Sequence, residues 1–233
     1  MQTILKAGDR GGVNLGWLDS RHSFSFGHYY DPRYQGVSVL RVINEDRVRP
    51  GAGFDTHGHQ DMEIITYVLE GTIAHRDSEG NVATLPAGNV QVMSAGRGIR
   101  HSEFNASETD PLHFLQIWVR PDRTGGTPRY QELDASDAPE WLIASPDGAD
   151  GSLEILQDAR LWLLRGDVWG NRDLPAGRLF YLHQIRGERR VGDQLLRAGD
   201  AITVYGQPQL AGSAGDNSET LLFDLPDQAP YLP

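Results

Sequence analysis

The feature that most constrains the fold of this chain is a succession of short apolar runs, each ended by glycine, proline, aspartate or asparagine. Such runs, closely spaced and without long amphipathic stretches of helical periodicity, are typical of an all-β sandwich or barrel. The sequence therefore predicts strands over residues 37–43, 63–69, 90–93, 112–119, 153–156, 161–164, 179–185, 201–204 and 220–224.

The two halves of the chain share a layout. The run 68–71 (Val-Leu-Glu-Gly) precedes Gly88 in a Pro-Ala-Gly-Asn turn, and the run 184–187 (Gln-Ile-Arg-Gly) precedes Gly199 in an Arg-Ala-Gly-Asp turn. Each pair predicts a strand, a hairpin and a turn into another strand, so a duplicated β-barrel is the simplest account. Residues 125–151, rich in Pro, Asp, Gly and Ser, look like the bridge between the halves. We expect two domains, 1–132 and 133–233.

Composition excludes several classes of function. The net charge of -11 makes direct binding to nucleic acid unfavourable, because an acidic chain repels the phosphate backbone. The absence of cysteine excludes disulfides, zinc–thiolate sites, iron–sulfur clusters and thiol nucleophiles. The first residues contain no apolar signal segment, and no stretch approaches the ~20 apolar residues of a membrane span. The sequence predicts a cytoplasmic protein that does not enter a membrane.

Two short motifs in the first half carry groups that bind metals. They are His57-Gly58-His59 and His101-Ser102-Glu103, and in each motif the two outer residues stand at positions i and i+2. Such residues point to the same face of a strand, so four ligands converge if the two segments lie close together. Imidazoles with one carboxylate suit Fe(II), Mn, Ni, Cu or Zn, and four ligands leave two positions open on an octahedral metal. A lone His-x-His pair means little in a chain with eight histidines, but this combination predicts a metal site.

The motifs resemble those of known proteins. Gly51, His57-x-His59 and Glu63 look like the first cupin motif, and His101 closes a stretched second motif. More specifically, three runs resemble the pirin family: 17–26 (Trp-Leu-Asp-Ser-Arg-His-Ser-Phe-Ser-Phe), 66–71 (Thr-Tyr-Val-Leu-Glu-Gly) and 93–103 (Met-Ser-Ala-Gly-Arg-Gly-Ile-Arg-His-Ser-Glu). The resemblance is strong in the first half and extends through the second mainly in length and layout.

The resemblance implies a fold and a ligand set. The fold is all-β, a bicupin of two tandem double-stranded β-helix (jelly-roll) barrels packed face to face. One divalent metal per chain is implied, Fe(II) first, with Mn, Ni, Cu, Zn or Co as alternatives. Its ligands would be His57, His59, His101 and Glu103, because the pirin family uses this later glutamate in place of one near Glu63. We expect Glu63 instead to anchor a neighbouring histidine or arginine.

The resemblance also implies two alternative functions. In the first, the protein is a quercetin 2,3-dioxygenase-like enzyme that opens the central ring of flavonols with dioxygen, and Glu103 serves as general base. In the second, it is a non-catalytic, redox-sensing regulatory protein that binds a transcription factor or a metabolic enzyme. For either reading we expect a monomer.

The remaining histidines and the second half supply no comparable ligand set. The spacing of the first-half ligands, projected onto the second half, falls on Asp173, Pro175, Gly212 and Ala214. We therefore expect a metal-free second domain, in which His183 is an ordinary barrel residue. The scattered histidines are expected to be structural or exposed: His22, His28, His75 and His113.

Overall fold

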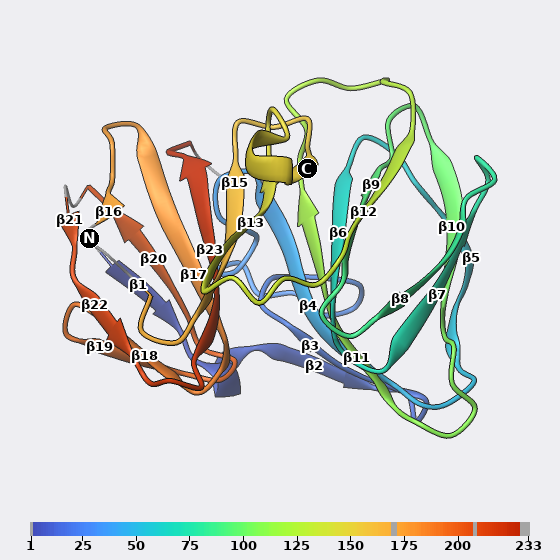
Figure 1. The fold of residues 1–233 in the computed structure, drawn as a ribbon, viewed down its shortest axis with the longest axis horizontal. Helices are drawn as coiled ribbons and strands as arrows, with labels where there is room; N and C mark the ends of the chain where they lie inside the picture. Colours follow the sequence, from blue (N-terminus) through green and yellow to red (C-terminus); the bar gives the residue numbers. More distant parts are fainter. Residues whose placement is uncertain (1, 169–171, 207–208, 229–233) are drawn as a thin grey trace.

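A computed structural model describes residues 2–168, 172–206 and 209–228 of the chain. The described residues form two β-barrels that lie side by side, with the first half of the chain on the right of Figure 1 and the second half on the left. Two short 3-10 helices, η1 (Ala7–Asp9) and η2 (Ala149–Gly151), lie between strands. The all-β bicupin prediction is confirmed.

The first barrel is built from two sheets. Its seven-stranded sheet has the order β12 (Arg129–Leu133), β9 (Val90–Ser94), β6 (Glu63–Glu70), β11 (Leu112–Val119), β4 (Leu40–Val48), β3 (Leu18–His22) and β2 (Gly11–Asn14). Its four-stranded sheet has the order β5 (Gly53–His59), β10 (Ile99–Asn105), β7 (Thr72–Asp77) and β8 (Val82–Pro86).

The second barrel repeats this plan with shorter outer strands. Its seven-stranded sheet has the order β1 (Gln2–Leu5), β20 (Ala201–Tyr205), β17 (Arg178–Arg186), β23 (Glu219–Pro226), β15 (Arg160–Arg165), β13 (Glu140–Ser145) and β14 (Leu153–Glu154). The outer strands are β19 (Gln194–Arg197), β18 (Glu188–Val191), β22 (Gly212–Ala214) and the pair β16 (Arg172–Asp173) and β21 (Gln209–Leu210).

The barrels pack through their seven-stranded sheets. The largest apolar cluster joins residues of both halves, such as Ile65 and Ile117 of the first with Leu221 and Phe223 of the second. These side chains alternate along each strand with those that fill the barrel interiors, as the pleat requires. The expected face-to-face arrangement therefore buries one apolar face of each sheet against the other.

Most of the expected strands are present, but two segments differ from expectation. The run 37–43 becomes a strand only at Leu40, after an isolated bridge from Val37, and 153–156 contains only the two-residue β14. The segment 125–151, expected to bridge the halves, also contains two strands, β12 of the first barrel and β13 of the second. β12 pairs with β9, and β13 pairs with β15. The polar residues in and around these two strands obscure the alternation of apolar residues by which a strand is recognised in sequence.

The domain boundary between residues 132 and 133 stays a prediction. The strand pairing shows in addition that the N-terminal strand of the chain belongs to the sheet of the second half. Residues 2–5 form β1, which pairs with β20 of the second sheet, before the chain returns to the first sheet at β2. Lys6 holds this crossing through Asp200, with its Nζ 3.0 Å from the Asp200 carboxylate. The segment 6–10 therefore straps the two halves together.

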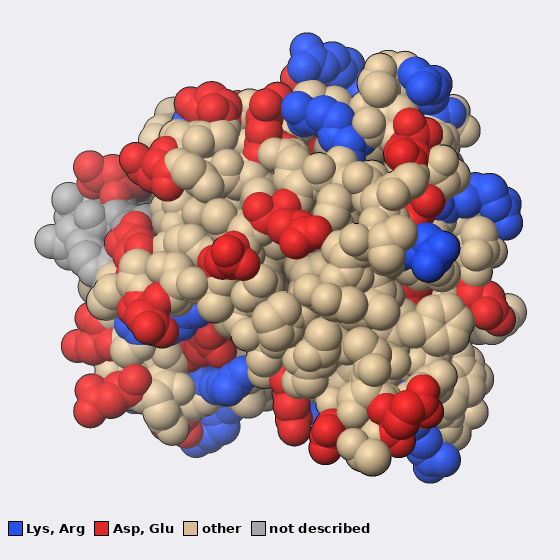
Figure 2. Space-filling view, turned by 45° about the vertical axis from the view of Figure 1, so that its right-hand side comes forward, with Lys and Arg blue, Asp and Glu red and all other residues tan. Residues whose placement is uncertain are grey.

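The surface is consistent with the acidic composition. Figure 2 shows acidic side chains spread over the face it displays, with basic side chains in small separate groups. No helix in the described part of the chain is long and apolar enough to cross a membrane.

His183 makes the junction between the halves sensitive to acid. Its side chain on β17 is 1% exposed, and burial, reinforced by Arg10, lowers its pKa to about 3. The unfolded chain takes up this proton near its ordinary pKa of about 6.5, so the stability that depends on neutral His183 is complete above that pH. It is lost as the pH falls from about 6.5 toward 3, at about 1.4 kcal/mol per pH unit.

We expect His183→Gln to flatten this dependence. Urea unfolding of both proteins at pH 7 and pH 4.5 gives the two slopes, and wild type should lose more stability than the variant. Equal slopes would contradict this assignment, whatever the stability of the variant at pH 7.

Candidate metal centre

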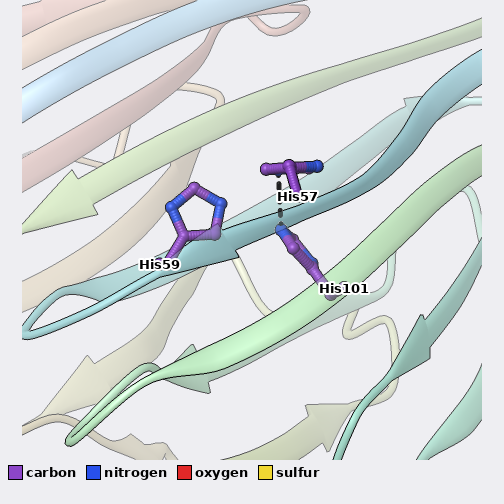
Figure 3. Close-up of side chains that lie close together, drawn as sticks. All are labelled: His57, His59 and His101. Carbon is purple, nitrogen blue, oxygen red and sulfur yellow. Dashed lines mark hydrogen bonds between the residues drawn. The ribbon is translucent and has the colours of Figure 1, made fainter.

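The two predicted ligand motifs lie on adjacent strands. β5 carries His57 and His59, and β10 carries His101 and Glu103; the strands run antiparallel with His57 opposite His101. The register shifts between His101 and Glu103, a local bulge of the kind that redirects side chains near active sites. Figure 3 shows the three rings turned toward one another across the two strands.

The three imidazoles form one compact group. Their ligand nitrogens all lie within 4.8 Å of one another, and Nε2 of His57 lies 3.1 Å from Nε2 of His101. His57 Nδ1 lies 2.8 Å from the carbonyl oxygen of Asp55, which can only accept a hydrogen bond. Neutral His57 therefore carries its proton on Nδ1 and directs the Nε2 lone pair at its neighbours.

The electrostatics of the site favour the neutral form of His59 and His101. Burial, then the nearby His101 and His57, lowers the pKa of His59 to about 4. Burial, then His57, lowers the pKa of His101 to about 3. Nε2 of His59 is buried and has no hydrogen-bond partner among the described residues. These nitrogens keep free lone pairs at neutral pH, which is the state that binds a metal.

Glu103 lies deeper in the barrel and is held by neutral donors. Its side chain is 2% exposed; Oε1 accepts from Gln91 Nε2 at 3.0 Å and from Thr66 at 3.4 Å, and Oε2 accepts from Gln116 Nε2 at 2.7 Å. It forms a second group with His75 and His101, whose ligand atoms also lie within 4.8 Å of one another. The four predicted residues thus fall into two groups that share His101.

The supporting residues were missed by the sequence reasoning. Tyr130 donates to Gln91 Oε1 at 2.8 Å, which fixes that amide so that its NH2 group faces Glu103. His75 stacks on Tyr130 at 4.6 Å and contacts Asp77 Oδ2 through Nε2 at 3.2 Å. The one signal of these residues in the sequence is His75-x-Asp77, a pair at positions i and i+2. The pairing of β7 with β10, which places His75 opposite Glu103, gives this pair its position at the site.

Glu63 does not have the expected role. Its carboxylate accepts a hydrogen bond from Ser94 Oγ at 2.7 Å, and burial raises its pKa. Among the described residues no histidine or arginine forms a hydrogen bond or ion pair with Glu63, and Arg129 acts on it only through its charge, which opposes the rise in pKa. Glu63 lies next to Ser94 across β6 and β9, and Ser94 reaches its carboxylate from there.

The projected positions of the second half are scattered over its outer strands. Asp173 lies on β16, Pro175 in the following loop, and Gly212 and Ala214 on β22. Among residues 2–168, 172–206 and 209–228, both ligand groups belong to the first half. The metal-free second domain stays a prediction.

The histidine group reaches a surface cavity at His59. A shallow cavity of about 400 Å³ is lined by His59 together with Ser78 and Arg100. Trp118 lies edge-to-face against His59, with ring centroids 4.9 Å apart. Its indole Nε1 is buried without an acceptor among the described residues. Trp118 thus places an apolar ring directly against His59.

The close approach of β5 and β10 depends on Gly53. A Cβ at this position would lie 2.4 Å from the carbonyl oxygen of Glu103 and 2.5 Å from Cα of Phe104, both backbone atoms that cannot move aside cheaply. At Gly58, in the same strand, the nearest atom to such a Cβ is the Ile99 carbonyl oxygen at 3.8 Å.

We expect Gly53→Ala to lower the free energy of unfolding by about 1–3 kcal/mol and Gly58→Ala to change it by less than about 0.5 kcal/mol. Denaturant unfolding of the metal-free proteins measures both. Equal effects of the two substitutions would contradict the strand contact.

Two family models match the chain. The model for pirin covers residues 6–119, and the model described as the quercetinase C-terminal cupin domain covers residues 142–225. The matches divide at the same bridge that separates the barrels.

Close relatives extend over nearly the whole chain. A quercetin 2,3-dioxygenase of Escherichia coli (strain K12) is 47% identical over 96% of this chain and 98% of its own length. A pirin-like protein of Caulobacter vibrioides is 38% identical over 92% of this chain and 95% of its own. The crystal structure of a bacterial pirin from Escherichia coli in complex with nickel(II) matches with a TM-score of 0.94 at 44% identity, over 98% of this chain and 100% of that one.

Proposed function

This chain belongs to the pirin family of cupin proteins, and from that premise we propose that it is a metal-dependent dioxygenase that opens the central ring of flavonols such as quercetin with dioxygen. The observation that carries the proposal is the convergence of three imidazoles, two of them with pKa values lowered by burial, beside the buried carboxylate of Glu103. The relative named quercetin 2,3-dioxygenase, which spans nearly the whole chain, supports the choice of substrate class.

The residues present fit a divalent metal. His59 Nε2 is a buried nitrogen without a partner among the described residues, and the Nε2 atoms of His57 and His101 face each other at 3.1 Å. We propose His57, His59, His101 and Glu103 as ligands of one ion, with Fe(II) as the first candidate. Nickel(II), which the related bacterial pirin binds in its crystal structure, is the second.

The bound metal would supply a Lewis acid that lowers the pKa of the substrate 3-hydroxyl. Glu103 is then the group that accepts the released proton. Gln91 and Thr66 donate to Oε1 and Gln116 donates to Oε2, which orients the carboxylate and leaves a lone pair on Oε2. A proton on Glu103 would lie in a buried site, away from bulk water.

The surroundings of the imidazoles suit a flat aromatic substrate. Trp118 offers a ring beside His59, and Met62 and Tyr130 belong to the same apolar cluster. A flavonol bound beside His59 would pack against the Trp118 ring while its oxygens face the histidines. This apolar cluster would exclude water from the ring that is opened.

Oxygen uptake tests the proposal. Metal-free protein is loaded separately with Fe(II), Ni(II), Mn(II), Co(II), Cu(II) and Zn(II), and quercetin is added in an oxygen-electrode cell. We expect oxygen consumption, loss of quercetin absorbance and release of carbon monoxide with at least one metal, and none with the metal-free protein. Absence of uptake with every metal would contradict the enzyme and favour the regulatory alternative.

A further inference from the structure

A second site lies between the two halves, beside the strap formed by residues 6–10. It is a cleft of about 690 Å³ that residues of both barrels line. Its walls are rich in charge in a chain whose net charge is -11. Four arginines face two glutamates there: Arg10, Arg21, Arg47 and Arg186 against Glu45 and Glu70.

Arg10 is built into the floor of this cleft. Its side chain is 6% exposed, and NH2 donates to Glu45 Oε2 at 2.8 Å. Its Nε and NH1 are buried and have no acceptor among the described residues. Gly199 of the second barrel leaves space for the Arg10 guanidinium, because a Cβ at this position would lie only 2.9 Å from Arg10 NH2. The guanidinium is therefore positioned by both halves and only partly compensated.

Glu45 cannot neutralise the cleft alone. Besides Arg10, it contacts Arg47 NH2 at 3.0 Å and His113 Nε2 at 3.0 Å. Although burial by itself raises the pKa of Glu45, hydrogen bonds from His113 and Arg10 hold that pKa well below its usual range. One permanent negative charge is thus shared by two arginines, which leaves an excess of positive charge at the base of the cleft.

The outer arginines remain accessible. The side chains of Arg21, Arg47 and Arg186 are 49%, 51% and 55% exposed. Arg21 contacts Asp19 at 3.4 Å, and Arg186 contacts Glu219 at 3.1 Å. These pairs leave part of each guanidinium open to solvent, where it can donate to a further oxyanion.

The cleft is separate from the histidine group. Along β4, Asn44 and Asp46 are buried, and Asp46 lies close enough to Glu103 to feel its charge. Glu45 and Arg47 alternate with them and point out of the barrel. The cleft and the interior of the first barrel, where the ligand groups lie, are therefore on opposite sides of the seven-stranded sheet.

We propose that this cleft binds a small anion bearing carboxylate or phosphate groups, held between Arg47 of the first barrel and Arg186 of the second. Guanidinium groups bind both kinds of oxyanion in a bidentate manner. The volume suits a small metabolite. Because its two arginines come from different barrels, such a ligand can bind only when the two barrels are packed against each other.

Titration calorimetry with inorganic phosphate and with citrate, in chloride buffer of constant ionic strength, tests the proposal and separates the two ligand chemistries. At least one of the two anions should bind. Arg47→Gln and Arg186→Gln should each weaken its binding about tenfold or more, since each removes a charge-assisted contact. Arg76→Gln, at an exposed position on β7 of the outer sheet, is the matched control and should leave the affinity unchanged.

Arg47 and Arg186 are half-exposed, so each variant should fold, and retained metal content would show that the histidine group is intact. The proposal is overturned if neither phosphate nor citrate binds above the chloride background. It is equally overturned if both cleft variants bind like wild type, or if Arg76→Gln weakens binding as much as they do.

Discussion

Replacement of Glu103 by glutamine is expected to lower flavonol turnover by about 100- to 10,000-fold, the usual contribution of a general base. Glutamine keeps the size and shape of the side chain but removes the basic oxygen. The fold should tolerate the change. Gln91 is fixed by Tyr130 and can still donate to the new amide oxygen, whereas Gln116 can turn its own amide to accept from the new NH2 group.

Glu63→Gln is the matched control for this prediction. Glu63 is also a buried glutamate of the first barrel, but its carboxylate is bound to Ser94 Oγ, which can donate equally well to an amide oxygen. Steady-state oxygen uptake with quercetin, combined with thermal unfolding of each variant, gives the comparison. A larger loss of turnover in Glu63→Gln than in Glu103→Gln would reject Glu103 as the base.

The double variant His57→Ala, His59→Ala is expected to lose the metal altogether, and turnover with it. Both rings lie on β5 and supply two of the three converging nitrogens, so His101 and Glu103 alone would remain. Two ligands leave a site too weak to survive desalting, because affinity depends on the number of ligands and their geometry. Elemental analysis should fall from one ion per chain to background.

The matched control removes two histidines elsewhere. His28 is exposed, and His113 on β11 contacts Glu45 in the cleft between the barrels, away from the histidine group. His28→Ala, His113→Ala should therefore keep one metal per chain. A full complement of metal in the His57, His59 variant would contradict the proposed ligands.

Much of the fold could be predicted because the internal repeat carries structural information. The run 68–71 ends β6 before the β7–β8 hairpin and the turn at Gly88, and the run 184–187 ends β17 before the β18–β19 hairpin and the turn at Gly199. Gly88 has φ of 92° and Gly199 has φ of 84°, in the region that favours glycine. Such turns are local and can be recognised in sequence. The pairing of β1 with β20 is not local, and no pattern in residues 2–5 indicates it.

The candidate site was predictable only in part. His57 and His59 lie on one strand, so their spacing alone implies a shared face. The register that brings His57 opposite His101 depends on how the outer sheet assembles. The support of Glu103 comes from three further strands through Thr66, Gln91 and Gln116, residue types that are common on β-surfaces and carry no signal in sequence. His75 is recognisable only once β7 is known to pair with β10.

Anomalous diffraction from a crystal of the metal-loaded protein, recorded at the absorption edge of the bound metal, tests the central claim most directly. We predict one peak per chain, about 2.0–2.2 Å from a ring nitrogen of His57, His59 and His101 and from a carboxylate oxygen of Glu103. A peak held by His75, His101 and Glu103 without the β5 histidines, or a peak in the second barrel, would contradict it.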